Sequence, residues 1–177
     1  TAMEHLRPLG YQIEPLMVSG RSSSDYNAKQ IARAVENLVL NKKNYLILIV
    51  HSKGVVDILH FLVNYPELAH RVDAVVSIAG AINGSPLANR VADIFGKLGA
   101  NLPIRECEPG DGGAFRSLER SARLTWMSNN PLPASVKYYS VVSFTDRDRI
   151  KIILVTGAFA ECFPKMGLPY QDAAARL

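Results

Sequence analysis

Residues 45–63 constrain the fold of this chain more than any other stretch. Six consecutive apolar residues, Tyr-Leu-Ile-Leu-Ile-Val, precede His51-Ser52-Lys53-Gly54, and apolar residues then recur at helical spacing as far as Val63. A short apolar run bounded by turns is typical of a parallel strand that is buried on both faces. The segment therefore predicts a buried strand over 45–50 that turns at Ser52 into a helix.

Similar patterns on either side predict a regular alternation of strands and helices. Strands are expected over 11–18, 45–50, 72–78 and 136–144. Helices are expected over 3–9, 28–40 (with Ser24 as its N-cap), 53–63, 88–98 and 114–128. Such alternation indicates an α/β fold with a mainly parallel sheet and flanking helices. Since 177 residues suit one domain, we expect a single α/β domain over 1–177.

Composition argues against several classes of function. Apolar residues make up 48% and charged residues 20%, which is ordinary globular composition. The 20 basic residues are scattered and the net charge is only +4, so we expect no binding of nucleic acid. The longest apolar stretches, 45–50 and 152–160, are too short to span a bilayer, so no transmembrane segment is expected. Cys107 and Cys162 fit a reducing compartment such as the cytoplasm, or one disulfide bridge.

The turn at Ser52 has two interpretations from its residues alone. A sharp strand-to-helix turn would expose the Ser52 hydroxyl and aim the backbone N–H of Lys53 at a developing oxyanion. Ser52 could equally be an ordinary N-cap of the following helix, because serine is a favoured capping residue. Both interpretations stay open at this point.

Several motifs, in order, resemble a known superfamily. His51-Ser52-Lys53-Gly54 resembles the nucleophile elbow of the α/β-hydrolases, and looks most like a bacterial lipase/esterase branch whose elbow reads G-Y-S-K-G. The likeness extends over about residues 6–149. Other matching stretches are Val18-Ser19-Gly20-Arg21, Tyr65-Pro66-Glu67-Leu68, Gly84-Ser85-Pro86-Leu87-Ala88 and 132–140.

The resemblance implies a serine hydrolase that acts on small-molecule carboxylic (acyl) esters. Ser52 would be the nucleophile, and the Lys53 backbone N–H would help to form the oxyanion hole, while the Lys53 side chain points away along the helix. Residues 87–131 resemble a cap or lid, although core packing explains their apolar side chains equally well. Neither a metal nor another cofactor is expected. Acyl transfer on the same elbow is an alternative reaction.

The chain also departs from the family pattern. Val50 stands where the family has its first glycine, so the elbow could be crowded. The family's triad runs Ser, then Asp or Glu, then His, but the last histidine here is His70. Asp146 is the candidate acid, with a solvated turn as its alternative interpretation, and the base is unknown. We therefore expect an incomplete hydrolase domain, or a non-catalytic binding relative or remnant.

The histidines themselves are poor candidates for the base. His51 is adjacent to Ser52, where the side chains diverge, and is expected to shape the pocket floor or sit in the core. His5, His60 and His70 are expected to be structural or surface residues.

Overall fold

The computed structural model describes residues 2–38, 45–85, 88 and 110–142. Short helical segments come first, before the sheet. In chain order, the described helices and strands are α1 (Ala2–Leu6), η1 (Arg7–Leu9), α2 (Ser24–Asn37), β1 (Ile47–His51), α3 (Gly54–Asn64), α4 (Pro66–Ala69), β2 (Ala74–Ile78), η2 (Arg116–Leu118), α6 (Arg120–Asn129) and β3 (Lys137–Val141).

The three strands form one parallel sheet in the order β1-β2-β3. Ile47 of β1 is opposite Ala74 of β2, which in turn is opposite Lys137 of β3. Parallel strands need crossover connections, and α3 with α4 supplies the one between β1 and β2. The expected α/β class with a mainly parallel sheet is confirmed.

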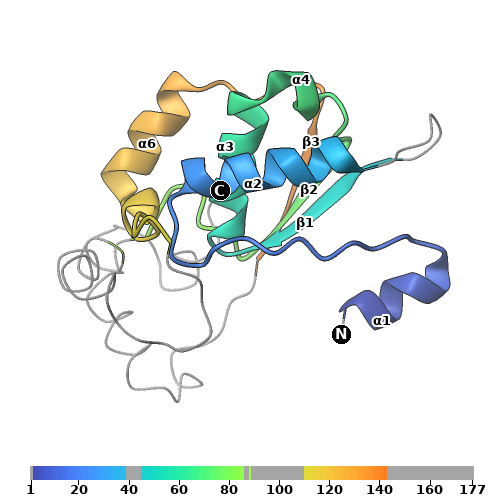
Figure 1. The fold of residues 1–177 in the computed structure, drawn as a ribbon. Coiled ribbons are helices and arrows are strands. Elements are labelled where there is room, and N and C mark those ends of the chain that lie inside the picture. Colours follow the sequence, from blue (N-terminus) through green and yellow to red (C-terminus); the bar gives the residue numbers. More distant parts are fainter. Residues whose placement is uncertain (1, 39–44, 86–87, 89–109, 143–177) are drawn as a thin grey trace, which may run out of the picture.

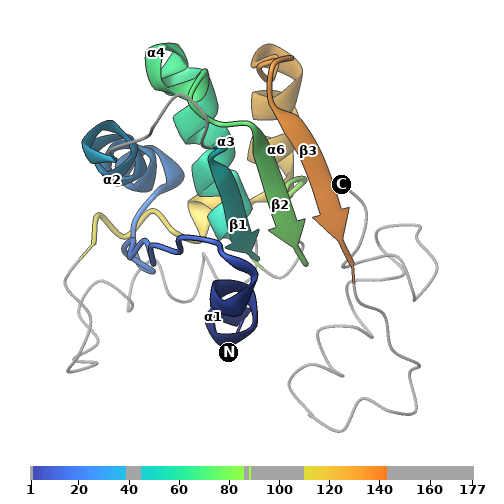
Figure 2. The same ribbon diagram turned by 90° about the vertical axis from the view of Figure 1, so that its right-hand side faces the viewer.

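The larger helices lie on one face of the sheet. Figure 2 views the sheet from its other face, with α3 and α6 behind the strands and α2 to the side of β1. The main core lies between α2, α3 and the sheet, and it includes the fully buried side chains of Ile31, Phe61 and Leu62 together with Val75. Helix α1 stands apart from this layer and is joined to it by the stretch 11–19 (Figure 1).

Local sequence explains where the first helices begin and end. Gly10 closes η1 in the left-handed conformation, with a φ of 88°, which glycine adopts without a steric penalty. Ser23 is the N-cap of α2, and its hydroxyl accepts a hydrogen bond from the backbone N–H of Tyr26 at 3.2 Å. The expected cap, Ser24, was wrong by one residue, because Ser24 is already the first residue of the helix.

Two expectations about strands were wrong. Residues 11–18 form no strand, because this mostly exposed stretch pairs with no strand among the described residues. Strand β1 is not buried on both faces: Leu48 and Val50 pack against the core, while Ile47 and Ile49 are 45% and 54% exposed. The cause is that all the large described helices lie on one side of the sheet.

The stretch 87–131 is described only at Ala88 and from 110 onward. The helix expected over 114–128 is shorter and later, because a 3₁₀ turn at 116–118 precedes α6. Trp126 and Met127 of α6 pack against Val55, Val56 and Leu59 of α3, which favours the core interpretation for these two residues. Apart from Ala88, the helix expected over 88–98 lies outside the described residues.

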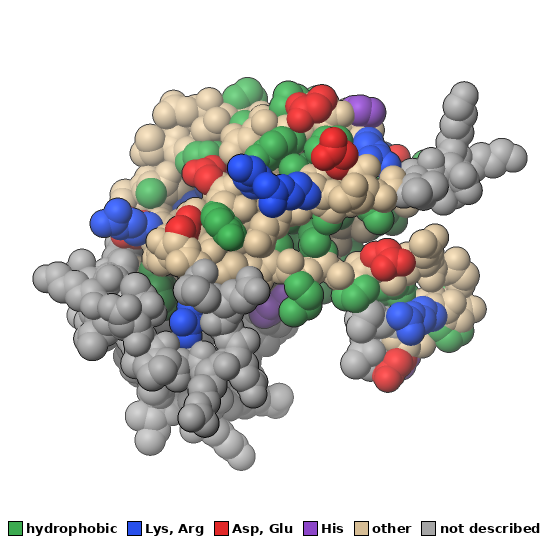
Figure 3. Space-filling model, in the orientation of Figure 1, with side chains coloured by type: hydrophobic (Ala, Val, Ile, Leu, Met, Phe, Trp, Pro, Cys, Tyr) green, Lys and Arg blue, Asp and Glu red, His purple; other side chains and the backbone are tan. Residues whose placement is uncertain are grey.

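The described surface carries mixed charge. Figure 3 shows acidic and basic side chains interspersed on the face that carries α2. Within the described part of the chain, no helix combines the length and the apolar character needed to cross a membrane.

Candidate active site

Ser52 lies where strand β1 turns into helix α3. Its φ of 52° is in the left-handed region, which is uncommon for a residue with a β-carbon and costs about 1 kcal/mol or more. The residue is exposed, directly after the carboxyl end of β1. The expected sharp turn from strand to helix at Ser52 is therefore confirmed, and β1, which precedes it, is an edge strand of the described sheet.

The alternative interpretation of Ser52 as an ordinary helix cap does not fit this geometry. The residue before the first turn of α3 is Lys53, and no side chain caps the helix there. A side chain that caps a helix sits on extended backbone, which the left-handed Ser52 does not have.

Val50 is accommodated at the position of the family's first glycine. A β-carbon built on Gly54 would lie 3.6 Å from the Val50 β-carbon, which is ordinary contact. Val50 itself packs against the buried clusters on both sides of α3. The turn therefore forms in spite of the β-branched side chain.

The loop after β2 is attached to the backbone of Ser52. The Ser52 N–H donates to Ile78 O at 3.1 Å, and the Ala81 N–H donates to Ser52 O at 3.3 Å. Ala79, in the same loop, is also left-handed, with a φ of 46°. Gly80 approaches so closely that a β-carbon there would lie 2.0 Å from the Ser77 hydroxyl and 2.8 Å from a Val55 methyl. The sequence analysis did not predict these contacts between the loop after β2 and Ser52. The Ala79-Gly80 pair directly after a strand is the sequence feature that could have indicated a close approach.

The Lys53 side chain follows helix α3 away from Ser52, as expected. Its Nζ lies 2.6 Å from Asp57 Oδ1, one helical turn on. Asp57 is buried, and its other oxygen accepts from Asn27 Nδ2 at 2.9 Å, while the same nitrogen donates to Ser19 O. These bonds connect α3 to α2 and to the loop before α2. The Lys53–Asp57 spacing is visible in the sequence, but the Asn27 contact is not.

Asp111 forms a second polar contact with the start of α2. Its carboxylate accepts hydrogen bonds from the backbone N–H and hydroxyl of Ser23 and from the Gly113 N–H, at 2.6, 2.5 and 2.9 Å. Burial raises the pKa of Asp111, but these hydrogen bonds outweigh it and hold the pKa below its usual value. Asp111 is therefore a carboxylate at neutral pH. Nothing in its sequence surroundings indicated this role.

No histidine is placed as a base for Ser52. The chain has four histidines, all within the described residues, and none of them hydrogen-bonds to Ser52. His51 is exposed on the open face of the sheet rather than in a pocket floor or core, and His5 and His70 are also exposed. His60 is buried, as a structural residue, between Asp25 and Arg123. The candidate acid Asp146 lies outside the described residues.

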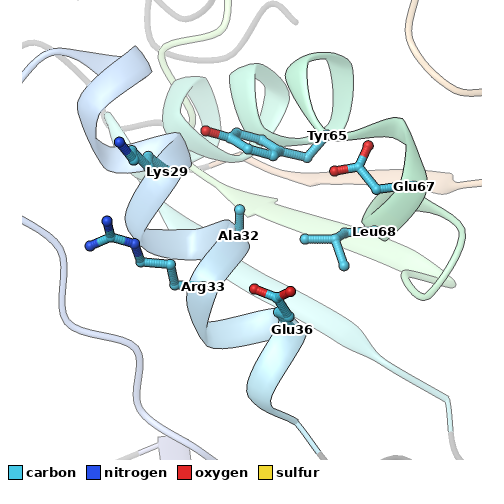
Figure 4. A pocket seen from close by; sticks show the side chains of 7 residues that line it. All are labelled: Lys29, Ala32, Arg33, Glu36, Tyr65, Glu67 and Leu68. Atoms are coloured by element: carbon cyan, nitrogen blue, oxygen red, sulfur yellow. The ribbon is translucent and has the colours of Figure 1, made fainter.

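A surface hollow of about 240 Å³ lies at the opposite end of α3 from Ser52. Figure 4 shows that α2 and the α3–α4 junction line it, with Lys29, Arg33, Glu36, Tyr65 and Glu67 around its rim. Ligand pockets usually measure about 300–1,000 Å³ and are largely apolar. The hollow therefore has no part in the candidate site.

Comparison with known proteins returned matches among solved structures only: no family model matches the chain, and neither does any curated protein sequence. The crystal structure of the metagenomic carboxyl esterase MGS0156 is 40% identical over 83% of this chain and 44% of its own, with a TM-score of 0.77. The mature lipase BlEst2 of Bacillus licheniformis is 21% identical over 68% of this chain and 48% of its own, with a TM-score of 0.50, and supports the fold alone.

This chain thus spans less than half the length of each of these two proteins. The agreement with the carboxyl esterase nevertheless covers most of the chain in both sequence and structure. It includes a parallel sheet with its helices, the architecture that the elbow motif implied. The chain belongs to the esterase and lipase branch of the α/β-hydrolase superfamily.

Proposed function

We propose that the chain carries the nucleophile elbow of a carboxylic ester hydrolase, with Ser52 as the nucleophile. The observation that carries this proposal is the left-handed, exposed Ser52 between β1 and α3. Such a turn holds a hydroxyl clear of the sheet, where a substrate carbonyl and a base can both reach it. The similarity to a carboxyl esterase supports esters as the substrate class.

In the proposed reaction, the Ser52 oxygen attacks the ester carbonyl and a base takes its proton. The carbonyl oxygen becomes an oxyanion, to which the Lys53 backbone N–H donates a hydrogen bond. Helix α3 begins at Gly54, and the partial positive charge at its N-terminus favours the same negative charge. The bond between the carbonyl carbon and the alcohol oxygen then breaks, the base gives its proton to that oxygen, and the alcohol leaves the acyl-enzyme. Water, deprotonated by the same base, attacks the acyl-enzyme, and the acid leaves as Ser52 takes the proton back.

The base, we propose, is none of the chain's four histidines. A general base must come within about 2.6–3.2 Å of the hydroxyl whose proton it takes. Both ring nitrogens of His60 are hydrogen-bonded to other residues, and none of the other three histidines forms a hydrogen bond with Ser52. A hydrolase built on this elbow therefore takes its catalytic histidine from outside these 177 residues. Asp146 remains the proposed acid, and 87–131 the proposed cap of the single domain.

A non-catalytic binding protein is the second candidate, and the missing histidine is the observation that favours it. In that case the elbow would persist only as part of the fold. The two candidates differ in what Ser52 does when a histidine is supplied, so the test must supply one.

The test is a chimera in which this chain replaces the matching part of the carboxyl esterase MGS0156. We expect the chimera to hydrolyse p-nitrophenyl butyrate and to react with an organophosphonate serine probe. Ser52→Ala should lower turnover by at least about 10³-fold and abolish labelling, because a triad serine has no substitute. Ser85→Ala, in the loop after β2, is the matched control and should keep both. A folded chimera that is inactive, or one whose activity survives Ser52→Ala, contradicts the proposal.

The unmodified chain completes the test. Residues 1–177 alone should show no more than trace turnover of the same ester, indistinguishable from their Ser52→Ala variant. Robust hydrolysis that disappears in this variant would show that one of the chain's own residues is the base. The proposal of an incomplete enzyme would then be wrong.

A further inference from the structure

His60 lies between two charged residues from two other helices. Its Nδ1 is 2.7 Å from Asp25 Oδ1 at the start of α2, and its Nε2 is 2.8 Å from Arg123 Nη1 on α6. A guanidinium can only donate hydrogen bonds, so Nε2 must accept and the proton of a neutral His60 must be on Nδ1. That proton is donated to Asp25. The arrangement therefore fits a neutral imidazole of one tautomer.

Arg123 contacts Ile82 and Trp126 in addition to His60. It is only 2% exposed, and its Nε donates to Ile82 O, in the loop after β2, at 2.9 Å. The Trp126 ring stacks on His60 at 4.2 Å and lies under the Arg123 guanidinium at 4.6 Å. Next to Ile82, Ala81 donates to the Ser52 carbonyl. A continuous series of contacts thus joins α2, α3 and α6 to the backbone of the elbow.

We propose that Asp25, His60 and Arg123 form an acid-sensitive latch, which holds α6 and the loop after β2 against α3 and releases them when His60 takes up a second proton. The latch is a property of the fold and does not depend on the proposed function of Ser52.

The physical reason is a conflict between two donors. A second proton on His60 must go to Nε2, where its N–H would face the Arg123 N–H across 2.8 Å, with like charges on both groups. The guanidinium would lose its acceptor at a site where its Nη2 already has no hydrogen-bond partner among the described residues. An unsatisfied buried polar group costs about 1–3 kcal/mol, and more when it is charged. Movement of Arg123 away from His60 relieves this conflict, and it carries α6 and the contact with Ile82 O along.

The charged groups around His60 support the direction of this effect. Burial lowers the pKa of His60 most; Asp25 and Asp57 raise it, Arg123 lowers it, and the result lies below the ordinary value of 6.5. Burial also lowers the pKa of Arg123, to about 10, so Arg123 stays charged through the acid range. The released state, with a solvated His60, binds more protons between the two pKa values of His60. Docking of α6 is therefore complete above about pH 6.5 and is lost as the pH falls through the lowered pKa.

A simple ion pair would behave in the opposite way. If protonation only strengthened the His60–Asp25 contact, α6 would dock more tightly in acid. The exposed Asp25, whose side chain is 73% accessible, is poorly placed to do this against a buried Arg123. The sign of the pH effect therefore distinguishes the latch from an ion pair.

The chain contains its own probe, because Trp126 is its only tryptophan and lies against two residues of the latch, His60 and Arg123. The experiment is a titration of residues 1–177 from about pH 8 to about pH 4.5, which spans imidazole protonation. Trp126 emission and its quenching by acrylamide are recorded beside far-UV circular dichroism. We expect a red shift and easier quenching with a midpoint below pH 6.5, while the helical signal is retained.

Three variants sharpen the titration. His60→Gln keeps an acceptor for Arg123 but cannot titrate, so the transition should disappear. Arg123→Met removes the donor and the charge that oppose a protonated His60, so the transition in Trp126 emission should disappear here too. His70→Gln, at an exposed histidine, is the matched control and should change nothing. A transition that persists in His60→Gln, or Trp126 emission that is constant with pH, overturns the latch, and so does loss of helical signal at the same midpoint.

A measurement on the unsubstituted chain guards against variants that fail to fold. Histidine NMR near neutral pH should show one of the four imidazoles as the Nδ1–H tautomer, with a pKa below the ordinary value of 6.5. Four imidazoles that all have the Nε2–H tautomer, or an Nδ1–H imidazole whose pKa lies above 6.5, overturn the proposal.

Discussion

The two faces of the sheet differ although the same strands build both. On the covered face, Leu48 and Val50 of β1 pack under α2 and α3. On the open face, Ile49 of the same strand is 54% exposed and Tyr139 of β3 is 55% exposed. Parallel sheets are usually covered on both faces, which is why such strands are apolar throughout. The comparison teaches that apolar residues along a whole strand show that both of its faces could be buried. Which face is buried depends on the helices that pack against the sheet.

The largest expected difference between the faces concerns Phe61. Its side chain is fully buried in the core between α2, α3 and the sheet. Phe61→Ala should lower the free energy of unfolding by about 3–5 kcal/mol, because it leaves a cavity in addition to the lost burial. Urea unfolding followed by circular dichroism measures this. Tyr139→Ala on the open face should cost far less, and equal losses would show that the open face is covered in solution.

A smaller effect is expected at Gly80, where the loop after β2 approaches the covered side. Gly80→Ala places a β-carbon 2.0 Å from the Ser77 hydroxyl and 2.8 Å from a Val55 methyl. Overpacking of this kind costs about 1–3 kcal/mol. Adding Ser77→Ala should recover part of the loss, since the Val55 contact remains. Gly20→Ala, which meets no atom within 4 Å, is the control and should be neutral or slightly stabilising in the same thermal unfolding experiment.

The smallest change in stability is expected for Ile49→Thr on the open face. Exposed substitutions usually alter the free energy of unfolding by less than about 0.5 kcal/mol. Its visible effect should be weaker binding of the dye ANS, because the exposed apolar surface shrinks. Val75→Thr, on the covered face of β2, buries a hydroxyl and should cost about 1–3 kcal/mol. A large loss from Ile49→Thr would contradict the assignment of the two faces.

The parts of the fold that follow from local sequence could be predicted well. Strand β1, the turn at Ser52 and helix α3 are consecutive, and their pattern changes where the structure does. Ser23 and Ser24 are adjacent residues of one kind, so the sequence could not say which of them caps α2. Residues 11–18 resemble a strand, but a strand forms only when another one pairs with it.

The polar contacts that surround the elbow could not be predicted in the same way. Lys53 and Asp57 are one helical turn apart, a spacing that can be read directly. His60 and Arg123 are 63 residues apart, and Ser23 and Asp111 are 88 residues apart. Each of these pairs meets only because the fold brings the loop at 110–113 back to α2 and brings α6 back to α3. Local sequence patterns contain no information about contacts between residues so far apart in the chain.

The register of β1 and β2 has a consequence for how this site can change. His51 and Ile78 are paired, and each is followed at once by a left-handed residue, Ser52 and Ala79 respectively. The chain therefore leaves both neighbouring strands at the same level, in two adjacent turns that main-chain hydrogen bonds of Ser52 hold together. Because these bonds use main-chain atoms, the side chain at position 52 can be exchanged while both turns keep their conformation. A single substitution at position 52 can thus change the reactivity of this site without refolding the turn that carries it.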